Sequence, residues 1–218
     1  MCPNMVEASA FKDALVNLFM TLYVVHHASK WGIVDGRVKL MKLLYFVEEE
    51  LTKRNMRGPS FIFYKWHYGS WSPEAQVDLE LLARNRLVAE DMERHIIEPT
   101  GEGLRLIQNS DPIIKRNREI FQLVDQAIVR NVDYRSWQIR EVSYGTPALG
   151  KKKVLIQSIS KGEVVLSPVD EEHAFKFFLV DDDWLDQIAM KVSSGFRELV
   201  EQVKEKPDLT DYAPITQQ

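Results

Sequence analysis

The sequence predicts a mainly α protein with small β-hairpins, an α+β fold. Its winged-helix-like core is expected to be flanked by an N-terminal helix and a helical C-terminal region. Two observations support this: apolar residues recur at helical spacing, and residues 36–108 follow the order helix, extended segment, helix, β-hairpin, helix. The 218 residues are 45% hydrophobic and 28% charged, so the chain can bury a core without a metal or disulfide.

Two amphipathic helices are expected near the start of the chain. The apolar positions within residues 11–25 form one stripe, so a helix is predicted over residues 9–30, followed by the helix breaker Gly32. The next helix follows Gly36 and is predicted to end at Gly58.

The middle of the chain has strong local signals. Residues 61–68 are rich in aromatic residues, which favours an extended segment. Ser72 can cap a helix and Pro73 suits its first turn, so a helix is predicted from there to about residue 84. Two short strands should surround the following polar turn, and a capped helix should come after them. The segments expected are 87–90, 95–99 and a helix capped by Thr100.

The second half is expected to be mostly helical, with one further hairpin. The elements predicted are a helix from Asp111 to Asn131, a hairpin of 154–156 with 164–166, a helix over 168–178 and a last helix over 185–203. The proposed division is residues 1–110 as one module, 111–206 as a C-terminal region and 207–218 as a frayed tail.

Catalytic and cofactor chemistry finds no support in the sequence. No phosphate-binding loop, dinucleotide turn, nucleophile elbow or zinc-protease helix occurs, so no enzyme activity, cofactor or metal is expected. The acidic run 181–183 precedes a helix and is interpreted as its cap. The five histidines show no converging pattern; they are His26, His27, His67, His95 and His173.

Composition also limits the compartment. The single cysteine, Cys2, excludes an internal disulfide and a cysteine-based zinc site. No apolar stretch is long enough to span a membrane, and the first residues lack the features of a signal peptide. A cytoplasmic protein with no membrane partner is therefore expected.

Twelve residues in three segments form one further pattern: Lys39, Leu40, Lys42, Leu43, Leu44, Tyr45, Phe46, Trp66, Tyr68, Gly69, Thr100 and Gly103. Their order and spacing resemble the Panacea domain, the antitoxin SocA-like family. The family pattern is a Lys-Leu-x-Lys-Leu-Leu-Tyr-Phe helix, an aromatic-x-Tyr-Gly-Pro segment ahead of a helix, and Leu-Thr-x-x-Gly. Ser70 and Pro99 depart from the pattern, where the family has Pro and Leu. The resemblance covers residues 36–108 and implies a non-enzymatic module that neutralises a toxin by binding it.

The aromatic segment is the first candidate for a contact surface with a protein partner, of which a toxin is one kind. Trp and Tyr dominate binding hot spots, although these side chains could equally belong to the core. The candidate residues are Tyr64, Trp66, His67, Tyr68 and Trp71. The oligomeric state stays open.

A DNA-binding transcriptional regulator is the alternative function. It is disfavoured because the net charge is −4 and because the helix that would read bases begins with acidic residues, Glu74, Asp78 and Glu80. Basic residues do outnumber acidic ones between positions 111 and 153. The side chains that would form a basic face are Arg84, Arg86, Arg130, Arg135, Arg140, Lys151, Lys152 and Lys153.

Overall fold

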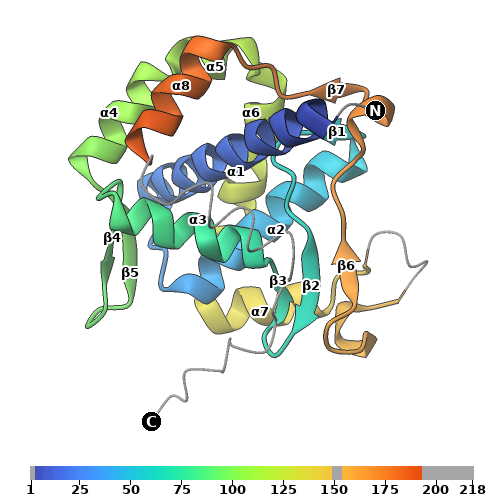
Figure 1. The fold of residues 1–218 in the computed structure, drawn as a ribbon. Helices are drawn as coiled ribbons and strands as arrows, with labels where there is room; N and C mark the ends of the chain where they lie inside the picture. Colours follow the sequence, from blue (N-terminus) through green and yellow to red (C-terminus); the bar gives the residue numbers. More distant parts are fainter. Residues whose placement is uncertain (1–2, 149–153, 193–218) are drawn as a thin grey trace.

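The computed structural model describes residues 3–148 and 154–192 and shows a mainly helical α+β fold, as predicted. Helix α1 (Pro3–Trp31) runs through the middle of the molecule (Figure 1). It contacts α2 (Arg37–Lys53), α3 (Pro73–Arg84) and α6 (Arg118–Asn131), and also α4 (Gly101–Asn109) and α8 (Asp182–Lys191). Helices from both sides of residue 110 therefore share one hydrophobic core.

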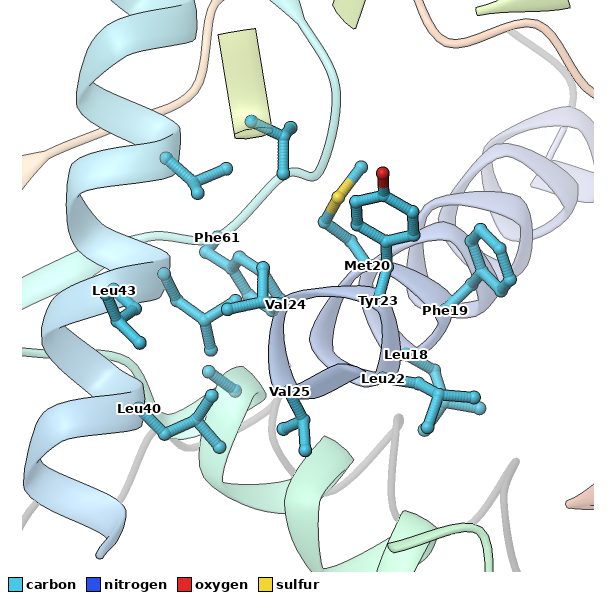
Figure 2. Close-up of a cluster of buried hydrophobic side chains, with 14 of the residues drawn as sticks. Leu18, Phe19, Met20, Leu22, Tyr23, Val24, Val25, Leu40, Leu43 and Phe61 are labelled. Carbon is cyan, nitrogen blue, oxygen red and sulfur yellow. The ribbon is translucent and has the colours of Figure 1, made fainter. Parts of the chain in front are cut away.

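The centre of α1 is buried on every side. Residues 15–25 are all buried, so the helix carries more than the single apolar stripe read from its sequence. Figure 2 shows its side chains leaving in several directions, with Leu40 and Leu43 of α2 and Phe61 on one side. A helix that is apolar all round suits a central position with neighbours on each face.

The middle of the chain follows its local signals closely. Helix α3 begins at Pro73, and the Ser72 hydroxyl accepts a hydrogen bond from the amide of Ala75. Strands β4 (Val88–Asp91) and β5 (Ile96–Pro99) form an antiparallel hairpin. Thr100 caps α4 by accepting from the Gly103 amide. These predictions are confirmed, whereas the likeness to a winged helix stays a prediction.

Two elements in the first third of the chain differ from the prediction. Helix α2 ends at Lys53 rather than Gly58, because Asn55 adopts a left-handed φ of 55° and the chain continues as strand β1 (Met56–Arg57). The predicted extended segment is a hairpin, in which β2 (Phe63–Trp66) turns through two residues into β3 (Gly69–Trp71).

The strands of the second half pair with distant partners. The predicted hairpin of 154–156 with 164–166 is wrong: β6 (Val164–Leu166) pairs with β2, and residues 156–158 form a 3-10 helix. The predicted helix over 168–178 is also wrong. That segment contains a 3-10 turn and strand β7 (Lys176–Phe177), which pairs in parallel with β1. Both strands complete sheets whose other members lie about 100 residues earlier.

The remaining helices differ from the predicted ones in their bounds, and one of them was not predicted. The helix expected from Asp111 to Asn131 is divided at Asn117 into α5 (Asp111–Arg116) and α6. Residues 136–144 form α7 (Ser136–Tyr144), which the sequence indicated only as an aromatic stretch. Helix α8 begins at Asp182, and the rest of the predicted last helix and the tail lie outside the described residues.

The division at Asn117 predicts a stability effect. This side chain is 3% exposed; its amide donates to the carbonyls of Ile113 (2.9 Å) and Leu179 (2.7 Å), and its oxygen accepts from the Leu179 amide (2.7 Å). Asn117→Ala should lower the free energy of unfolding by about 2–3 kcal/mol, because it leaves backbone groups without partners. Urea denaturation measures this. The exposed Asn109→Ala is the control, and an equal effect of both substitutions would contradict the expectation.

Candidate functional site

The β2–β3 hairpin brings the five predicted contact residues together. In its register Tyr64 faces Trp71 and Trp66 faces Gly69, while His67 and Tyr68 form the turn. The turn requires Gly69, whose φ is +92°. Within this group His67 is exposed, Tyr64, Tyr68 and Trp71 are half-buried, and Trp66 is only 8% exposed. Most of the predicted aromatic surface is therefore already covered within the protein.

Lysines lie over aromatic rings both at this hairpin and at the neighbouring helix α7. Lys161 Nζ lies 3.9 Å from the centre of the Trp66 ring and 3.0 Å from the Nε2 of His67. Lys65 Nζ lies 4.2 Å from the centre of the Tyr144 ring. These are cation–π contacts made by residues that the sequence analysis did not single out. A lysine 94 residues away from His67 gives no local signal in the sequence.

A buried lysine lies beneath the hairpin. Lys42 of α2 is 1% exposed, and its Nζ donates to the carbonyl oxygen of Ser70 in β3. A Cβ added at Gly69 would lie 3.2 Å from this nitrogen, so the glycine leaves room for it. Burial lowers the pKa of Lys42 to about 7, with further lowering by the nearby Lys65 and Arg140. The hairpin is thus held to α2 by a side chain that titrates near neutral pH.

Two of the candidate DNA-binding arginines lie at the C-terminal end of α3. Arg84 is the last residue of this helix and Arg86 follows it. Pro73, at the other end of the helix, adjoins β3 of the hairpin. A helix of 12 residues is about 18 Å long, so the hairpin and these two arginines adjoin opposite ends of α3.

The other basic candidates are partly paired. Arg130 lies 3.3 Å from Glu50, and Arg140, beside the ring of Tyr68, lies 3.0 Å from Glu141. Arg135 is exposed just before α7. The candidates Lys151, Lys152 and Lys153 lie outside the described residues.

A second aromatic surface lies where the end of α1 meets the start of α7. Gly32 packs on Val132, where an added Cβ would be 3.1 Å from the Val132 Cγ2, and Ser136 donates from its hydroxyl to the Asp35 carbonyl. Large side chains flank these contacts and face water. We call them the α1–α7 patch: Trp31 (59% exposed), Ile33 (51%), Tyr134 (38%) and Trp137 (63%). Sequence alone did not show that these residues would be exposed together.

The histidines and the acidic run do not form a metal-binding cluster in the described part of the chain. There, no group of three or more His, Cys, Asp or Glu side chains could hold a metal ion. His27 lies 3.3 Å from Asp125, and burial is the main cause that lowers its pKa. Asp181 caps α8 by accepting from the Trp184 amide, as expected, and also pairs with Arg116 at 3.0 Å.

Comparisons with known proteins identified no related protein. The chain matches no protein-family model, no curated protein and no solved structure. None of the helices within residues 3–148 and 154–192 is long and apolar enough to cross a membrane.

Proposed function

We propose that this chain is a non-enzymatic protein-binding module of the cytoplasm and that its partner contacts the α1–α7 patch. The observation behind the proposal is that Trp31 and Trp137, on two segments in contact, are both more than half exposed. Tryptophan is the residue most typical of binding hot spots. Large apolar side chains that face water on adjoining segments are candidates for an interaction site.

The surroundings of the patch indicate the chemistry of the partner. Lys30 and Arg135 are exposed next to patch residues in the sequence, as is the acidic Asp133, whereas Arg130 pairs with Glu50. A complementary protein surface would offer an apolar pocket bordered by carboxylates. The resemblance to antitoxins makes a toxin the partner that we propose, with neutralisation by binding.

The hairpin has a different part in this proposal. Lys161 of the protein itself lies over the Trp66 ring, and Trp66 has little surface left for a partner. We therefore place the main contact on the α1–α7 patch and regard the hairpin as a support for the neighbouring helix α7. The hydroxyl of Tyr144, in α7, donates a hydrogen bond to the carbonyl of His67 in the hairpin turn (2.6 Å).

The test is co-purification with tagged full-length protein, from the native host and after co-expression with the product of the neighbouring gene. The double substitution Trp31→Ser and Trp137→Ser should reduce recovery of the partner by roughly tenfold or more, because each removes a large apolar contact. Phe175→Ser is the matched control, since Phe175 is 79% exposed at a different place and should not matter.

Two results would contradict the proposal. One is recovery of the same protein partner with the double variant as with the native chain. The other is the absence of any protein partner together with DNA binding that weakens steeply with salt, which would favour the regulator instead.

A further inference from the structure

A cavity of about 300 Å³ lies between α1, the first turns of α3 and the segment after β1. Its volume equals about ten water molecules, enough for a small organic group. It is remote in sequence from the residues of the α1–α7 patch. The lining residues that matter here are Ala14, Asn17, Arg57, Glu74, Val77 and Asp78.

A buried carboxyl group with one unpartnered oxygen lines this cavity. Asp78 is 5% exposed, and its Oδ2 accepts no hydrogen bond from the described residues. Glu74 lies one turn earlier on α3 and lines the same cavity, with its Oε2 accepting from the Ser72 hydroxyl at 2.7 Å. Burial raises the pKa of both carboxyls, and the proximity of Glu74 raises that of Asp78 further, against the effect of the Thr21 hydroxyl. Two acids here are costly without a positive partner.

Two other polar groups of the wall have partners. Arg57 donates to Asp13 (2.7 Å) and to the carbonyl of Val169 (2.7 Å), and the Asn17 oxygen accepts from the Ser60 amide (2.7 Å). Three carboxyl groups, Asp13, Glu74 and Asp78, line the cavity together with this one arginine. Acidic groups therefore outnumber basic ones in the wall, which favours a ligand with positive charge and hydrogen-bond donors.

We infer that this cavity binds a primary alkylammonium group, with its N–H groups directed at Asp78 and Glu74 and its aliphatic part against Ala14, Ile62 and Val77. An ammonium supplies three donors and a compact charge, which two carboxylates one helical turn apart can share. The apolar lining suits a short carbon chain. No cluster of acidic and histidine side chains in the described residues is arranged for a metal ion, which favours an organic cation.

This group has two natural sources, a free small amine and the lysine side chain of a protein. The inference stands without the proposed function, because its evidence is a different set of residues. If the source is a lysine, the cavity would be a second recognition point for a protein partner.

The probe for the test is n-pentylamine, titrated into the full chain, with 1-pentanol as its neutral counterpart. We expect saturable binding of the amine, no saturable binding of the alcohol, and amide chemical-shift changes at residues 74–78. Asp78→Asn should weaken binding by roughly tenfold or more, because it removes a charge-assisted hydrogen bond. Asp186→Asn, at an exposed position of α8, is the matched control and should bind as the native chain does.

A second arm separates the two sources. Nα-acetyl-lysine amide that binds as tightly as pentylamine would indicate a protein side chain, and binding of pentylamine alone would indicate a free amine. Equal binding of amine and alcohol, or no saturable binding of either amine, would overturn the inference. If Asp78→Asn does not fold, as judged by circular dichroism, Glu74→Gln and the chemical-shift map of the native chain decide the question.

Discussion

Replacing Gly103 with alanine should destabilise the protein severely. A Cβ at this position would lie 2.1 Å from the carbonyl oxygen of Leu87 and 3.1 Å from the Leu22 side chain. The Leu87 oxygen is backbone and already accepts from the Thr100 amide, so it cannot move without opening the junction between β4 and α4. We expect a loss of about 3–5 kcal/mol, which lowers the melting temperature by roughly 10 °C or more.

Gly101 provides the matched control for this substitution, two residues earlier in the same helix. An added Cβ at Gly101 meets no atom within 4 Å. Gly101→Ala should therefore leave stability unchanged or raise it slightly, because alanine restricts the unfolded chain. Thermal unfolding of both variants checks the pair. Similar melting temperatures for the two would show that the close approach of α4 to Leu87 is not a constraint.

The second large effect concerns the pH dependence of stability. The pKa of Lys42 is about 7 in the folded protein, against 10.5 for an ordinary lysine. Between these values the unfolded chain binds more protons than the folded one, so stability contributed through Lys42 rises with pH and is lowest below pH 7. From pH 7 to pH 9 this gain amounts to about 2 kcal/mol.

Lys42→Met should remove that gain. Urea denaturation at pH 7, 8 and 9 is expected to show the native chain gaining stability relative to the variant at each step. Comparing the two chains cancels the other groups that titrate in this range, among them Lys39, whose pKa burial also lowers. The exposed Lys30→Met is the control and should follow the native curve. Parallel curves for the native chain and Lys42→Met would contradict the assignment.

The elements that sequence predicted best are those specified by neighbouring residues. Helix α3 carries its own cap, Ser72, and its own first-turn proline, and the β4–β5 hairpin joins strands that follow each other in the chain. The failures are the partner of β6 and the whole of β7. Residues 164–166 form a strand as predicted, but this strand pairs with β2 rather than with 154–156, and β7 pairs with β1. Local pattern cannot reveal hydrogen-bond partners that lie about 100 to 120 positions away.

The candidate site shows the same division. The aromatic segment was found from composition, but neither its hairpin nor the lysine over Trp66 was predicted, because Lys161 reaches Trp66 through the pairing of β6 with β2. The exposure of an aromatic side chain was not predictable from the sequence either. Trp66 and Trp137 are the same residue type, yet one is 8% exposed and the other 63%. The difference depends on tertiary neighbours that no spacing rule supplies.

The single core has a consequence for how the protein is made. Phe19 in α1 packs edge-on against Trp184 in α8, with ring centres 5.1 Å apart. At ordinary synthesis rates, roughly 8–33 s separate the addition of these two residues on the ribosome. During that time the most apolar helix of the chain lacks one of its covering helices. The nascent chain is therefore expected to depend on chaperones and to resist proteases only after α8 has emerged.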